Sequence, residues 1–174
     1  MMKRLHAFAG AGLFALWVSV PLGASAATFS SPGLQFTTSP TGTITLKTPS
    51  SFGASVTCRI QLTGGVRLDG SAADIQYVRF SGTEPLCQRI QMNNGATWKL
   101  TPTTLTTGEL SNVGFVITAL LPIIPASNCG PATISVGLVN GPGVVNVSAL
   151  NMYLPGSCAV ASLNVAIPAT SIIP

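Results

Sequence analysis

The feature that most constrains this chain is a recurring alternation of apolar and polar residues with a period of two. Every second residue is apolar in 43–47 and 58–62, and the pattern returns in 132–138 and 161–167. Such alternation is typical of half-buried β-strands. No stretch keeps helical i, i+3, i+4 spacing without an interrupting Gly, Pro or β-branched run. We therefore expect an all-β chain.

Turn signals separate the alternating segments and suggest how the strands connect. They are Asp69-Gly70, Asn94-Gly95, Asn140-Gly141 and Pro155-Gly156, and Thr63-Gly64-Gly65 is expected to turn the chain after Leu62. Short strands at this spacing predict an antiparallel β-sandwich or a small barrel-like sandwich.

The N-terminal residues have the pattern of an export signal. A basic start precedes an apolar run over 7–22 and an Ala-Ser-Ala motif at 24–26, which predicts cleavage before Ala27. We expect residues 1–26 to be a secretory signal peptide and 27–174 to be a single secreted all-β domain without a membrane-spanning segment. Its expected location is extracellular or at the cell surface, with the periplasm as the other compartment.

All four cysteines, Cys58, Cys87, Cys129 and Cys158, lie in the expected mature part, and an even number in an exported chain predicts disulfides. Their spacing does not suit a metal site, and no histidine accompanies them. Cys58 to Cys87 spans as many positions as Cys129 to Cys158. Either coincidence or a degenerate duplication explains this, and a duplication would favour those two pairs among the three connectivities.

The usual catalytic groups are scarce. The only histidine, His6, lies in the predicted signal peptide, which removes the commonest general base from the mature part. Asp69 and Asp74 are the candidates for a carboxylate pair, although Asp69 also suits a turn, and Glu84 and Glu109 are expected in loops. We expect no enzyme, with no catalytic, cofactor-binding or metal-binding residues. A small carboxylate-dependent secreted hydrolase is the least favoured hypothesis.

Charge is confined to one part of the chain. From Leu110 to Pro174 there is no Asp, Glu, Lys or Arg, whereas basic residues such as Lys47, Arg59, Arg67 and Lys99 take outward strand positions. Their small excess over the acids gives no support for nucleic-acid binding. Two explanations of the uncharged half stay open. Its strands form a buried core, or it meets a hydrophobic surface, an oily substrate or other copies of the protein.

Trp98 has a similar pair of explanations. It lies in phase with Leu100, which favours a core position, while ligand stacking is the alternative.

The chain resembles the secreted bacterial alkane oxidation protein activators, or Pra-type proteins. The resemblance is carried by Ala27-Thr28-Phe29, 41–46, Thr57-Cys58, Leu86-Cys87, Asn128-Cys129-Gly130 and Gly156-Ser157-Cys158. It implies an extracellular, non-catalytic protein linked to growth on hydrophobic alkanes and to biofilm surfaces.

Two functional hypotheses from different classes lead. The first is a non-catalytic secreted accessory protein that acts at hydrophobic interfaces, in alkane use, biofilm or surface adhesion, alone or by self-association. The second is a pilus- or fimbria-like subunit completed by strand exchange, with the alternating stretch 34–37 as the donated strand.

Overall fold

The computed structural model of the protein describes residues 27–38, 42–93 and 95–174. The predicted signal peptide lies outside the described residues. The described part contains these strands and short 3-10 helices: β1 (Thr28–Phe29), β2 (Gln35–Thr37), β3 (Gly42–Lys47), η1 (Pro49–Ser51), β4 (Ser55–Val66), β5 (Ala73–Ser81), η2 (Pro85–Arg89), β6 (Ile90–Met92), β7 (Trp98–Pro102), β8 (Thr107–Ile117), β9 (Ser127–Gly141), β10 (Val144–Leu154), β11 (Cys158–Pro168) and β12 (Ile172–Ile173). No helix long and apolar enough to cross a membrane occurs among those residues.

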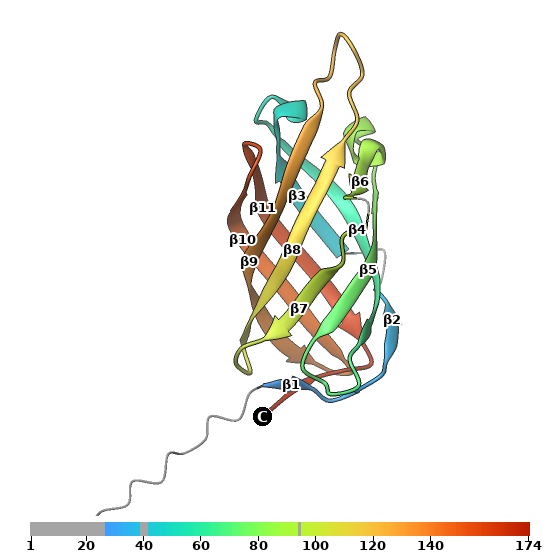
Figure 1. Ribbon diagram of the computed structural model, residues 1–174, viewed down its shortest axis with the longest axis vertical. Coiled ribbons are helices and arrows are strands. Elements are labelled where there is room, and N and C mark those ends of the chain that lie inside the picture. Colours follow the sequence, from blue (N-terminus) through green and yellow to red (C-terminus); the bar gives the residue numbers. More distant parts are fainter. Residues whose placement is uncertain (1–26, 39–41, 94) are drawn as a thin grey trace, which may run out of the picture.

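Eight strands close an antiparallel barrel (Figure 1). Their order around the wall is β4-β3-β11-β10-β9-β8-β7-β5, and β5 pairs back with β4. Each wall strand therefore pairs with the wall strand before or after it in the chain, apart from the closing pair β3–β11. β6, which lies between β5 and β7 in sequence, is not part of this order. The predictions of an all-β antiparallel fold and two disulfides are confirmed, and of the two architectures considered the chain adopts the barrel. Closure leaves few strand edges exposed, which is how an all-β protein avoids edge-to-edge pairing.

The barrel interior is filled with apolar side chains. Ile44 and Leu46 of β3 are buried, as are Ile134, Val136 and Leu138 of β9, in keeping with the predicted alternation.

Trp98 belongs to this core. It is 1% exposed, and its indole nitrogen donates a hydrogen bond of 3.3 Å to the Gly114 carbonyl. The core explanation is therefore confirmed over ligand stacking.

Two predicted turns are wrong. At Gly64-Gly65 the chain does not turn, because β4 runs on to Val66 and pairs there with both β2 and β5. A Cβ atom on Gly64 would overlap the Asp74 carbonyl oxygen, so the glycine permits close strand approach.

The turn expected at Asn140-Gly141 comes later, at Pro142 and Gly143. Asn140 instead hydrogen-bonds the backbone of Ile172 through both side-chain atoms, at 2.9 and 2.8 Å. The turns at Asp69-Gly70 and Pro155-Gly156 are confirmed, while Asn94 lies outside the described residues.

The two disulfides, Cys58–Cys87 and Cys129–Cys158, lie toward the same end of the barrel, with Cα separations of 5.5 and 5.7 Å. Each joins the first strand of a long hairpin to the segment that follows its second strand. This is the pairing that a duplication would favour. We call this end, which also carries the loops 48–54 and 118–126, the upper end, as it is oriented in Figure 1.

Candidate functional site

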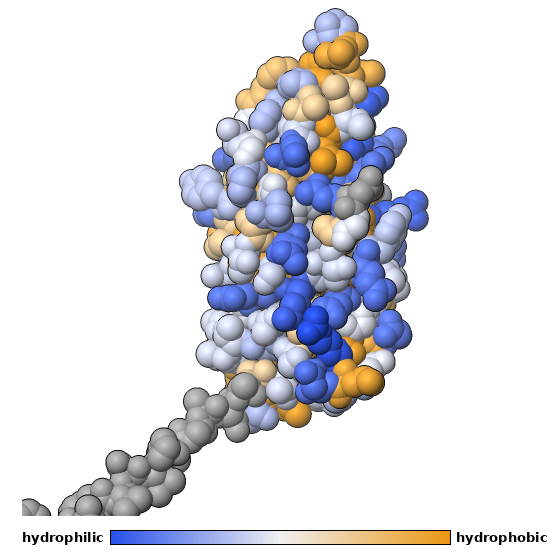
Figure 2. Space-filling model, viewed as in Figure 1, coloured by the Kyte–Doolittle hydropathy of each residue, from blue (hydrophilic) through white to orange (hydrophobic). Residues whose placement is uncertain are grey.

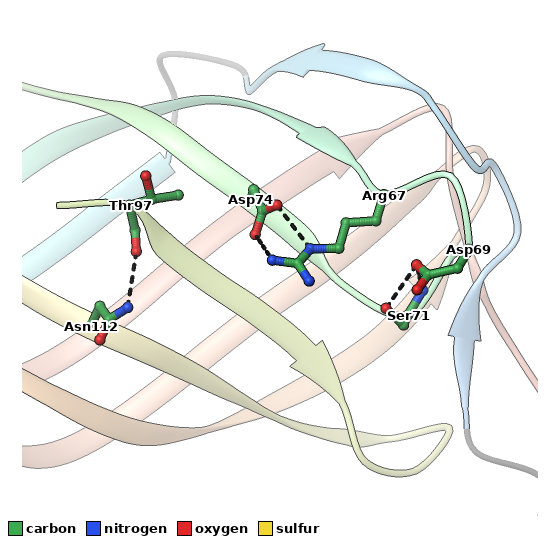
Figure 3. A network of polar contacts seen from close by, with 6 residues as sticks. All are labelled: Arg67, Asp69, Ser71, Asp74, Thr97 and Asn112. Carbon is green, nitrogen blue, oxygen red and sulfur yellow. Dashed lines mark hydrogen bonds and ion pairs between the residues drawn. The ribbon is translucent and has the colours of Figure 1, made fainter. Parts of the chain in front are cut away.

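The two candidate catalytic carboxylates do not form a pair (Figure 3). Asp74 on β5 accepts two hydrogen bonds from Arg67, from Nε at 2.9 Å and from Nη2 at 3.1 Å. Hydrogen bonding to Asp74, together with its negative charge, raises the pKa of Arg67. Asp69 in the β4–β5 turn accepts bonds from the backbone and hydroxyl of Ser71, and these lower the pKa of Asp69. Both carboxylates thus organise the turn.

The remaining acids lie elsewhere. Glu84 precedes η2 at the upper end, whereas Glu109 pairs with Ser135 across β8 and β9. Within the described ranges, no group of three or more His, Cys, Asp or Glu side chains could hold a metal ion.

The uncharged half of the sequence forms one continuous part of the wall, from most of β8 through β9 and β10 to β11. Its apolar side chains mostly point inward, and residues such as Thr133, Ser135, Asn146 and Asn164 are exposed outside. For these strands the buried-core explanation therefore holds. Exposed apolar exceptions are Val139, Leu150 and Tyr153.

Three exposed apolar side chains of this half, Leu120, Leu121 and Ile123, lie close together in the loop between β8 and β9. We call residues 118–126 the apolar tip. Figure 2 shows it protruding beyond the barrel at the upper end. Leu121 is 82% and Ile123 67% exposed. Leu120 and Ile124 form an isolated antiparallel bridge, with backbone hydrogen bonds of 2.9 and 2.8 Å. The bridge holds the tip in a defined hairpin shape.

A second loop at the same end supports the base of the apolar tip. Ser50 of η1 donates its hydroxyl to the Pro125 carbonyl at 2.7 Å and its backbone N–H to the Ser127 hydroxyl at 2.8 Å. Phe52 follows η1 in a left-handed conformation and is 78% exposed. Loops 48–54 and 118–126 contain no charged residue. These two loops therefore present apolar side chains on a hydrogen-bonded base.

Sequence reasoning found this site only in part. The apolar stretch 114–121 is continuous in the sequence, but β8 ends at Ile117, where pairing with Ser127 of β9 also ends. The prolines at 122 and 125 signal the loop that follows. Phe52 was missed, because its role depends on contacts between η1 and a segment distant in sequence.

These features define a class of protein: a small, disulfide-linked β-barrel with a filled interior and an exposed apolar tip at one end. The family model described as "Alkane oxidation protein activator PraA/PraB-like" matches residues 1–174, the whole length given. The chain belongs to this family, and the resemblance noted in its sequence is confirmed. Comparison with curated proteins and with solved structures finds no match. The family name implies a role in activating alkane oxidation and suggests an accessory protein.

Proposed function

We propose that this chain is a secreted, non-catalytic accessory protein that acts at the boundary between water and hydrocarbon. The apolar tip is the part that enters the hydrocarbon. The observation that carries this proposal is the exposure of Leu121 and Ile123 on a hydrogen-bonded hairpin that projects beyond a polar wall. The family name supports the link to alkanes.

The shape of the tip favours a fluid partner. A stable protein–protein interface buries roughly 1,200–2,000 Å² in total over complementary surfaces. A narrow projection meets a flat partner with only a few side chains, whereas a liquid hydrocarbon closes around it without needing a complementary shape. No charged group in 118–126 has to be dehydrated on entry.

The gain on entry can be worked from the exposed fractions. Fully burying a Leu or Ile side chain is worth roughly 1.5–3 kcal/mol. Scaled by the 82% and 67% exposure of Leu121 and Ile123, the two side chains contribute about 2–4 kcal/mol. That corresponds to roughly 30- to 900-fold in the partition constant.

Interfacial tension tests the proposal. Pendant drops of hexadecane in a solution of the oxidised protein should show a fall in tension, and L121S/I123S should need at least about tenfold more protein for the same fall. The matched control is L68S/L105S, which removes two exposed apolar side chains from turns at the opposite end. Equal losses in the two double variants, or no fall in tension with the wild-type protein, would contradict the proposal.

Self-association is the second arrangement that a specific observation favours. Leu150 and Tyr153 of β10 are exposed on a wall that carries no charge to repel another copy. Sedimentation with and without hexadecane droplets distinguishes assembly of the protein in solution from assembly at the oil surface. Binding of cells that display the protein to the same droplets tests adhesion.

The fimbria-like alternative has less support. Residues 35–37 of the stretch considered for donation form β2, which pairs with β4 of the same chain at 63–65. The barrel is closed by the chain's own strands. A monomer that unfolds cooperatively without added peptide would weigh against strand exchange.

A further inference from the structure

One stretch of the barrel wall is incompletely paired. β5 pairs with β7 only over Ala73–Ile75, which lie opposite Leu100 to Trp98 of β7. The separate strand β6 pairs with the end of β8. From Gln76 onward, β5 is hydrogen-bonded to β4 but has no ladder partner on its other side within the described residues. A groove of about 560 Å³ lies between this edge of β5 and β6.

A β-bulge aims neighbouring side chains into this groove. The pairing of β4 with β5 shifts between Thr63 and Gly64, so Gln76 has no opposite residue and both Gln76 and Tyr77 are exposed. Arg79 follows on the same face. Across the groove lie Gln88 of η2 and Gln91 of β6, both exposed.

The lining matches a hydroxyl-rich ligand. Each glutamine amide offers both donors and acceptors, which suits sugar hydroxyls because each hydroxyl also donates and accepts. Tyr77 is 59% exposed and offers an apolar ring face with a polar tip. No carboxylate lines the groove and Arg79 is its one charged lining residue among those described, so neither a cation nor a multiply charged anion is well matched.

The width of the groove argues against a peptide strand. A strand inserted between β5 and β6 would need about 9.5 Å between them, twice the usual spacing. Cα atoms of the two strands approach within 8 Å. The volume lies within the roughly 300–1,000 Å³ of small-molecule sites.

We propose that this groove binds a neutral saccharide unit, with Gln76, Gln88 and Gln91 contacting its hydroxyls and Tyr77 its ring face. This site lies on the side of the barrel and does not depend on the hydrocarbon contact proposed for the apolar tip.

The test is a titration of the ¹⁵N-labelled oxidised protein with the methyl glycosides of glucose, galactose and mannose and with N-acetylglucosamine. At least one should shift backbone amide signals of 76–80 and 90–92 in a saturable way. Q91A should weaken that binding about tenfold, the loss expected from one or two hydrogen bonds. Y77A should weaken it similarly, whereas Y77F, which keeps the ring, should bind within about twofold of wild type.

The matched control is N164A, which removes an exposed amide from β11 on the uncharged wall. It should leave sugar binding unchanged. Amide spectra of each variant outside the groove, and its unfolding midpoint, establish that the barrel is intact. The proposal is overturned if none of these sugars shifts the groove signals, if Q91A and N164A bind equally well, or if glucuronate or inorganic phosphate binds more tightly than every neutral sugar.

Discussion

Removing either disulfide should destabilise the barrel by the same amount, because the two bridges close loops of the same length. Each joins cysteines 29 positions apart. In the chain-entropy description, closing a loop of about 30 residues stabilises the folded state by about 3.6 kcal/mol. The double variants C58A/C87A and C129A/C158A each also lose two buried sulfur atoms. This second cost is therefore similar for the two pairs and largely cancels in their comparison.

The local consequences should differ, because the two bridges hold different segments. Cys87 lies in η2, which is outside the strand ladders of the described residues. Cys158 opens β11 and is paired with Leu154 of β10, and the neighbouring Gly130 N–H donates to the Pro155 carbonyl at 3.0 Å. Loss of the first bridge should release 82–89, whereas loss of the second should leave its hydrogen-bonded surroundings in place.

Urea unfolding and hydrogen exchange measure the two effects. Each double variant should lose about 3–4 kcal/mol of unfolding free energy, equivalent to a fall of about 7–14 °C in Tm for a domain of this size. Amide exchange in 82–89 should accelerate in C58A/C87A alone. A difference of more than about 1.5 kcal/mol between the variants would refute the loop-length argument. Equal protection of 82–89 in both would refute the account of η2.

Three further substitutions test particular contacts. D69A should lower the free energy of unfolding near neutral pH. The folded-state pKa of Asp69 lies below its ordinary 3.8, so the difference from wild type should disappear as pH falls below 3.8 through that lowered value. Urea unfolding at neutral and at acidic pH measures this difference. W98F should cost roughly 1–3 kcal/mol in urea unfolding, since the buried Gly114 carbonyl loses its indole donor. G64A should cost roughly 1–3 kcal/mol and lower Tm, because its Cβ would meet the Asp74 backbone oxygen; an unchanged Tm would show that β4 and β5 can separate there.

The sequence predicted which side of β3, β4, β9 and β11 faces inward, because burial on one face imposes alternation directly on neighbouring residues. Ile44 and Leu46 on β3, and Ile134 to Leu138 on β9, follow that alternation. Closure into a barrel could not be read in the same way. It depends on pairing β3 with β11, which joins segments far apart in the chain, such as Ile44 with Leu163.

Glycines misled the turn predictions for a physical reason. The same absence of a side chain that lets glycine turn also lets another segment approach closely: Gly64 admits the β5 backbone, and Gly65 admits the Gln35 side chain. Composition alone does not separate the two uses. At Asp69-Gly70 the turn is distinguishable, because the carboxylate bonds to Ser71 and Gly70 has a φ of 69°.

The apolar tip and the groove beside β5 could also be predicted from the sequence only in part. The apolar stretch of the tip is visible in the sequence, but its exposure depends on where β8 and β9 stop pairing. The saccharide groove has a weaker signal. Gln88 and Gln91 lie close together in sequence, yet Gln76 and Tyr77 both face outward beside them only because of a bulge in β5.

The absence of charge after Leu110 also acquires a physical meaning from the barrel. The apolar tip rises from β8 and β9, where the charged and uncharged parts of the wall meet. If the tip enters hydrocarbon, a barrel that leans toward β9, β10 and β11 brings hydroxyl and amide groups close to the oil, whereas one that leans toward β5 and η2 brings Arg79 and Glu84. Dehydrating an ion costs far more than dehydrating a hydroxyl or amide. On the proposed function, the uncharged wall should set the direction of tilt, and spin labels on β10 should be shielded from aqueous quenchers at the oil surface more than labels on β5.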